Sequence, residues 1–101
     1  MELQAAAEKL IKLSPSVRVV TICDRNGKLV FSAHAKRVKN VLSAKQSKDS
    51  LRTAAKAWKM RRALAGKLGA CKYVVAEYGN VKRITMPAGR DHILYVTTTA
   101  A

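Results

Sequence analysis

The feature that most constrains the fold is one long helical segment placed between two sets of strand-like segments. Residues 47–68 place apolar side chains on one side of a helix: Leu51, Ala54, Ala55, Trp58, Ala65 and Leu68. Ser47 is a good N-cap residue, Asp49 follows in the first turn, and Gly69 is placed to end the helix. A helix with one apolar stripe must bury it against another layer, so this segment predicts a sheet beside it.

Two strands are predicted before the long helix. Residues 17–23 and 29–34 are rich in β-branched side chains, and Asn26-Gly27 between them readily adopts positive φ, which predicts a hairpin. Farther upstream, leucines and alanines recur at helical spacing over residues 2–13 and predict a first, shorter helix.

Three further strands are predicted after the long helix, at residues 72–78, 81–86 and 92–99. Gly79-Asn80 is a two-residue hairpin loop, and residues 87–91 form a longer one. Residues 35–46 are interpreted as a loop with a short helical turn. The chain, residues 1–101, is therefore expected to be one α+β domain of order α-β-β-α-β-β-β, a five-stranded antiparallel sheet with the helices on one face.

The charge is unbalanced and concentrated in one region. The chain has 20 Lys and Arg against 6 Asp and Glu, a net charge of +14. Residues 36–72 hold twelve of the basic residues and a single acid, Asp49. Several of these cations step by three or four and so share one side of the long helix, interrupted at Ala63. Such a net charge destabilises the folded chain by self-repulsion, which an acidic partner relieves.

We therefore predict a nucleic-acid-associated module that contacts the phosphate backbone of DNA or RNA, ribosomal RNA included, through residues 36–72. All five aromatic residues lie in predicted helices and strands and are expected in the core, so we expect backbone contact rather than base stacking. A charged stripe is more often a merely solvated helix face, but such faces usually mix signs. The candidate binding residues are Lys36, Arg37, Lys39, Lys45, Lys48, Arg52, Lys56, Lys59, Arg62 and Lys67.

Other classes of function are disfavoured by the sequence. No Gly-rich phosphate loop is present, and neither histidine has a carboxylate or cysteine at a useful local spacing, so we predict no enzyme, no cofactor and no metal site. Cys23 and Cys71 are far apart and are interpreted as small apolar residues of a reducing compartment. No apolar run is long enough to span a membrane, and a cytoplasmic location is expected. Arg61 or Arg62 is expected to pack near Trp58 or to pair with Glu77.

The strand sequences carry a resemblance to a known family. They are residues 19–24 with 26–28, then 72–78, 81–87 and 92–98. In this order they resemble the roadblock/dynein-light-chain fold, and profilin-like and PAS-like domains share the general plan. They are also similar to a family of small archaeal proteins. The resemblance covers about residues 14–99. Two departures are a far more basic central helix and no C-terminal helix after Thr99.

The resemblance implies a non-enzymatic homodimer that pairs through its central helix and a neighbouring strand. Some members of that superfamily regulate small GTPases. One alternative function is therefore a dimeric scaffold or regulator that binds an acidic protein partner or a small GTPase. Another is a PAS-like or profilin-like ligand sensor, which requires an internal cavity.

Overall fold

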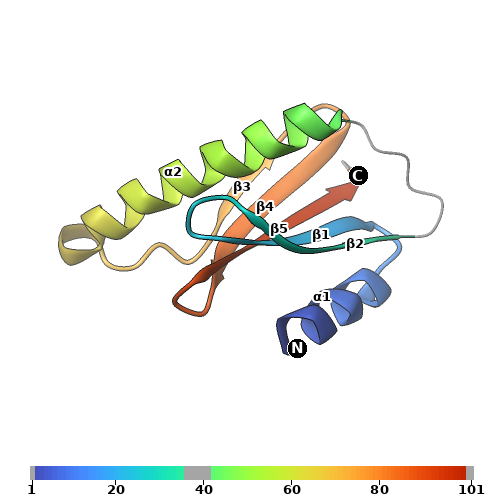
Figure 1. Cartoon of the computed structure of the whole chain (residues 1–101), viewed down its shortest axis with the longest axis horizontal. Helices are drawn as coiled ribbons and strands as arrows, with labels where there is room; N and C mark the ends of the chain where they lie inside the picture. Colours follow the sequence, from blue (N-terminus) through green and yellow to red (C-terminus); the bar gives the residue numbers. More distant parts are fainter. Residues whose placement is uncertain (1, 36–41, 100–101) are drawn as a thin grey trace.

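The computed structural model describes residues 2–35 and 42–99 of the chain (Figure 1). The elements are α1 (Glu2–Leu13), β1 (Val17–Asp24), β2 (Leu29–His34), α2 (Ala44–Leu68), β3 (Val74–Glu77), β4 (Val81–Ala88) and β5 (His92–Thr99). All seven predicted elements are present in the predicted order. The predicted α+β class with a five-stranded antiparallel sheet is therefore confirmed.

The strands lie in the order β2-β1-β5-β4-β3, and every neighbouring pair is antiparallel. The last strand, β5, is thus the central one, and β2 and β3 form the two edges. Side chains alternate between the two faces along each strand. On β5, Ile93 and Tyr95 face one way, whereas Leu94 and Val96 face the other.

The expectation that both helices lie on one face of the sheet is wrong. Helix α1 places Ala7 against Val20, Ile22 and Val96. Helix α2 packs on the other face, in a second cluster that includes Trp58. Figure 1 shows α1 and α2 on opposite sides of the sheet. The physical reason is that strands such as β1 carry buried apolar residues on both faces, so each face requires a cover.

Helix α2 begins earlier than the sequence indicated. Its N-cap is Ser43, whose hydroxyl accepts the N–H of Gln46 while the Gln46 side chain accepts the N–H of Ser43. This reciprocal capping box satisfies two backbone donors at the helix start. The predicted N-cap at Ser47 is therefore wrong, and Asp49 lies beyond the first turn. Gly69 does end the helix, with a φ of 83°.

The predicted hairpin turns are confirmed. The Asp24 carboxylate accepts the N–H groups of Asn26 and Lys28, and Gly27 has a φ of 86°. Tyr78 donates its N–H to the carbonyl of Val81, which closes the two-residue loop at Gly79-Asn80. Strand β3 is shorter than predicted, whereas β4 continues through Pro87 to Ala88. A proline fits there because β3 begins at Val74, opposite Thr85, so Pro87 lies beyond the part of β4 that pairs with β3.

Candidate interaction surface

Helix α2 is attached to the sheet near its middle. Ala55 and Trp58 are buried against Cys23 and Ile93. The Trp58 indole N–H donates to the Thr85 hydroxyl at 2.8 Å, and the Arg61 guanidinium lies 5.1 Å from the ring centroid. Arg61 thus packs on Trp58, as one of the two predicted options, whereas Glu77 pairs with Lys82 at 3.3 Å instead. These contacts fix which sides of α2 remain in solvent.

One exposed side of α2 is lined by cations. We define the basic flank as Lys45, Lys48, Arg52, Lys56 and Lys59, all of which are exposed. Their spacing of three or four residues keeps them on one side of the helix. No ion pair involves them among residues 2–35 and 42–99. The structure therefore brings five of the ten predicted binding residues together as one positively charged surface.

The other predicted binding residues lie elsewhere. Arg62 follows Ala55 by seven residues and so shares the side of α2 that faces the sheet, yet it is exposed. Lys67 is exposed in the last turn. Both residues are accessible because the C-terminal end of α2 extends past the strand ends (Figure 1). Lys36, Arg37 and Lys39 lie outside the described residues.

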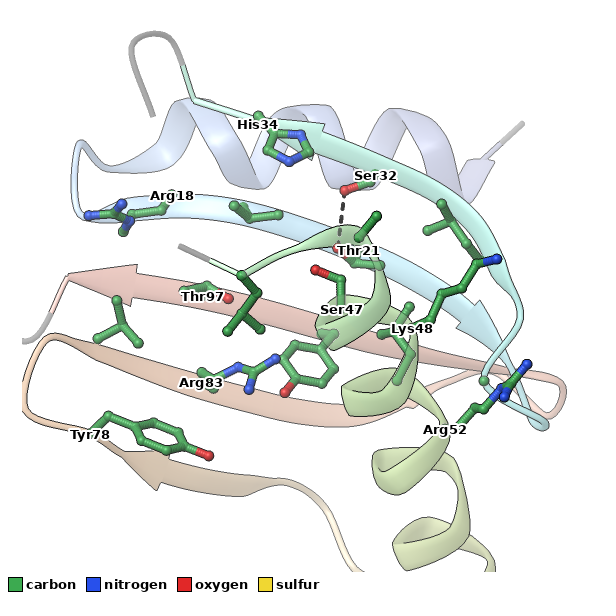
Figure 2. A pocket seen from close by; sticks show the side chains of 18 of the residues that line it. Arg18, Thr21, Ser32, His34, Ser47, Lys48, Arg52, Tyr78, Arg83 and Thr97 are labelled. Atoms are coloured by element: carbon green, nitrogen blue, oxygen red, sulfur yellow. Dashed lines mark hydrogen bonds between the residues drawn. The ribbon is translucent and has the colours of Figure 1, made fainter. Parts of the chain in front are cut away.

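A large open groove separates the N-terminal half of α2 from the sheet. Its volume is about 1280 Å³, and it is lined by all the strands except β3, by the loop after β3 and by the first turns of α2. Many lining residues are exposed, so the hollow opens to solvent and is not the internal cavity that a PAS-like sensor requires. Figure 2 shows Arg18 and Arg52 at opposite ends and Arg83 between them.

Three cations outside α2 are the part of this surface that sequence reasoning missed. Arg18, Lys28 and Arg83 line the groove together with Lys48 and Arg52 of the basic flank. The only signal was alternation along the strands: Arg83 precedes Thr85 by two and therefore shares its face. The strands carry few charges, so this alternation does not show that Arg83 faces a groove until the position of α2 is known.

Arg83 connects the sheet to α2 without neutralisation by a carboxylate. Its guanidinium donates to the Ser50 hydroxyl at 2.7 Å and lies 4.5 Å from the centroid of the Tyr95 ring. The Tyr95 hydroxyl is 3.1 Å from the same Ser50 oxygen. No carboxylate pairs with Arg83 in the part of the chain that the structure describes. The groove therefore keeps the full charge of this arginine.

A third surface is apolar and lies on the exposed outer side of α2, at Met60, Leu64 and Leu68. We refer to these three residues as the apolar strip. Tyr73, Val75 and Tyr78 are also exposed, within β3 or directly beside it. Val75 pairs with Ile84, which packs on the α1 face, so Val75 points away from α2. Tyr73 and Tyr78 were expected in the core, and that expectation is wrong because both flank the edge strand and are exposed.

Two titratable side chains, Cys23 and Asp24, have shifted pKa values. Burial raises the pKa of the Cys23 thiol to about 11, so this thiol is neutral and unreactive at physiological pH. The backbone N–H of Lys28 holds the pKa of Asp24 below its usual value, with a smaller contribution from the backbone N–H of Asn26.

Within residues 2–35 and 42–99, no three His, Cys, Asp or Glu side chains form a metal-binding group. Neither described helix has the length and apolar character needed to cross a membrane.

Comparison with solved structures identifies the fold. A roadblock/LC7 domain from Streptomyces avermitilis aligns with a TM-score of 0.72 and 14% identity, over 96% of this chain and 78% of that one. MglB from Myxococcus xanthus aligns with a TM-score of 0.74 and 20% identity, over 98% and 76%. MglB in a tetrameric arrangement aligns with a TM-score of 0.78 and 17% identity, over 97% of this chain and 71% of that one.

These likenesses concern the fold, since the sequences have diverged strongly. No protein-family model matches the sequence, and no curated protein is similar to it in sequence. Two of the similar structures are of MglB, one of them tetrameric. None of the comparisons supports nucleic-acid binding.

Proposed function

We propose that this chain, which has the roadblock fold, is a non-enzymatic homodimeric scaffold that binds an acidic partner protein. The observation that carries this proposal is the division of one helix into two accessible surfaces, the apolar strip and the basic flank. A small GTPase is the partner class that the family resemblance implies. The chain meets such a partner through charge on the basic flank, and it meets its own copy through the apolar strip.

The apolar strip supports self-association. Met60 is 67% exposed and Leu68 is 78% exposed, an unusual degree for large apolar side chains on neighbouring turns of one helix. The adjacent strand β3 has unpaired backbone groups along its outer edge, which are free to pair with another strand. Pairing of two copies by a twofold axis covers the helix residues and the strand edge together.

The oligomeric state tests this half of the proposal. Size-exclusion chromatography with light scattering should give twice the chain mass of 11.0 kDa. Leu64→Glu should shift the protein to the monomer, because it places a charge in the apolar strip. The matched control is Leu13→Glu, which changes a leucine that is 74% exposed on α1. A monomeric wild-type protein, or equal effects of the two substitutions, would contradict the proposal.

The basic flank supports the acidic partner. Five exposed cations without a paired carboxylate repel one another and attract a negatively charged surface. An affinity purification with nuclease treatment should retain an acidic protein, and Lys56→Glu with Lys59→Glu should release it. Retention of that protein by the charge-reversed variant would contradict this part.

Nucleic-acid binding is the second candidate function, and the same flank favours it because its lysines suit sequence-independent phosphate contact. A salt titration of DNA and RNA binding distinguishes the two functions. Contact with several phosphates predicts a log–log slope of about −4 or steeper, at about −0.9 for each contact. A flat salt dependence, or no binding at low salt, excludes this candidate.

A further inference from the structure

The groove beneath the N-terminal half of α2 has a charge pattern that the proposed scaffold function does not use. Five cations line it: Arg18, Lys28, Lys48, Arg52 and Arg83. No Asp or Glu lies among its lining residues. Asp49, next to Lys48 in sequence, lines a smaller hollow on the β3 side of α2. Asp24 lies near Lys28 but accepts the backbone N–H groups of the hairpin turn. The lining thus has five cations and no carboxylate of its own, which favours a ligand with negative charges.

The charges stand far apart along the groove. Arg18 is near the start of β1, whereas Lys28 and Arg52 lie at the hairpin that follows its end (Figure 2). A strand rises about 3.3 Å per residue, so the six steps from Arg18 to Asp24 span about 20 Å. A ligand with one anionic head group meets only one end of this length. A ligand with anionic groups at both ends meets the cations at both ends.

The middle of the groove has one cation, Arg83, whose guanidinium is already bonded to Ser50 and packed on Tyr95. Around it the lining combines apolar side chains, such as Val19 of β1 and Leu51 of α2, with hydroxyl groups. The hydroxyls of Thr21 and Ser32 are 3.1 Å apart and satisfy each other, which leaves this part of the floor little need for a polar ligand. The matching ligand therefore has apolar side chains between its anionic ends.

The size of the groove favours a peptide over a small molecule. Its volume of about 1280 Å³ exceeds the range of about 300–1,000 Å³ that is usual for small-molecule sites. Single-stranded nucleic acid is a poorer fit, because stacking needs free aromatic faces. Of the two tyrosines in the lining, Tyr95 is buried with one face occupied by the Arg83 guanidinium at 4.5 Å, so Tyr78 is the single exposed aromatic ring that the lining offers to successive bases.

We propose that this groove binds a segment of the acidic partner protein that has carboxylates at both ends and apolar residues at its centre. The inference rests on the proposed function, which places an acidic partner on the adjoining basic flank. Lys48 and Arg52 belong to both surfaces and connect them. About six extended residues cross the groove, and acidic residues on either side reach Arg18 at one end and Arg52 at the other.

Fluorescence anisotropy with a labelled peptide of about twelve residues tests the inference. The probe has three glutamates at each end and leucine, valine and serine between them. Lys48→Glu with Arg52→Glu should weaken its binding by about tenfold or more, because it replaces two attractive charges at one end of the groove by two repulsive ones. The matched control is Lys56→Glu with Lys59→Glu, an equal charge change on the same flank outside the groove, and it should change binding less. Circular dichroism verifies that both variants are folded.

A second variant tests the groove itself rather than its charge. Thr97→Trp fills the floor and leaves every cation in place, so it should also weaken binding of the probe. A peptide of the same composition with its glutamates clustered in the centre should bind more weakly than the probe. Equal losses in the two charge-reversal pairs, unchanged binding to Thr97→Trp, or equal binding of the rearranged peptide would overturn the inference.

The outcomes also separate this inference from the proposed function. If the acidic partner is captured and released by Lys56→Glu with Lys59→Glu, but the probe does not bind the groove, the function stands and the inference is wrong. If neither the partner nor the probe binds, both are wrong. Displacement of the probe by a single-stranded oligonucleotide as readily as by unlabelled peptide would also overturn the inference.

Discussion

The two faces of the sheet differ in how completely they are covered. On the α1 face, Val20 and Ile22 are at most 1% exposed beneath α1. On the α2 face, Trp58 closes one end, whereas Thr21 and Thr97 at the other end border an open groove. The same strands supply both faces, so strand sequence alone does not explain the contrast. The contrast is explained by the direction in which α2 crosses the sheet.

The contrast indicates where stability and binding are located. The α1 face and the Trp58 end of the α2 face supply buried apolar area, which is the main source of folding free energy. The open end of the α2 face supplies charge, hydroxyl groups and space. A change in the closed regions should therefore alter stability, and a change in the open region should alter binding with little effect on stability.

Trp58→Ala should have the largest effect on stability. It removes the largest buried side chain of the α2 face together with its hydrogen bond to Thr85, so the free energy of unfolding should fall by about 3–5 kcal/mol. Denaturant unfolding measures this. Thr97→Ala at the open end is the matched control and should stay within about 0.5 kcal/mol of wild type. If Trp58→Ala and Thr97→Ala lowered the free energy of unfolding equally, the two ends of the α2 face would not differ in their contribution to stability.

Gly27→Ala should have the next largest effect. A Cβ atom at Gly27 would lie 2.8 Å from the Leu51 carbonyl oxygen and 2.8 Å from the Arg52 Cα, and the φ of 86° disfavours any side chain. Strain and overpacking together should cost about 2–4 kcal/mol. Gly89→Ala is the control, since Gly89 also has positive φ but open space around it. A similar loss at Gly89 would show that close packing of the turn on α2 contributes nothing.

The Cys23 thiol should make stability depend on pH in the alkaline range. Burial raises its pKa from 9.0 to about 11, so between these values the unfolded chain loses a proton that the folded chain retains. This thiol should leave the free energy of unfolding unchanged below pH 9 and lower it by about 2 kcal/mol as the pH approaches 11. Unfolding of wild type and Cys23→Ala across this range measures the difference. Parallel pH profiles would contradict the burial of this thiol.

Ser43→Ala should have the smallest effect. It removes the side-chain half of the capping box, and the free energy of unfolding should fall by about 1 kcal/mol. Ser47→Ala lies one turn later on the same helix and should cause no loss, because Ser47 does not cap it. Thermal unfolding of the two variants measures both. A loss of stability in Ser47→Ala and not in Ser43→Ala would show instead that α2 begins at Ser47, as the sequence suggested.

The fold could be predicted from sequence where the determining interactions are local. The hairpin at Asn26-Gly27 depends on positive φ and on the Asp24 carboxylate within four residues, so the sequence contains its cause. The start of α2 was misplaced because Ser43 and Ser47 are chemically equivalent N-caps. The choice between them depends on the reciprocal partner at Gln46, a pairing that was overlooked.

The candidate surface could be predicted only in part. The basic flank follows from helical periodicity, and its five residues lie as expected. The groove could not be predicted, because it joins Arg18 and Lys28 near the start of the chain to Arg83 near the end. The sequence places Arg18 and Arg83 on strands and Lys28 in a hairpin turn, but it does not contain the angle between α2 and the sheet.

The sequence by itself determined the number and order of the elements, the hairpins and the predominance of positive charge along α2, where Asp49 is the one acid. These follow from backbone preferences and from side-chain periodicity, which act over a few residues. Only the tertiary structure decided that α1 and α2 lie on opposite faces, that β3 is left as an exposed edge, and that α2 leaves half of one face open. Those outcomes depend on which apolar surfaces pack against each other across the whole chain, and local sequence does not specify that choice.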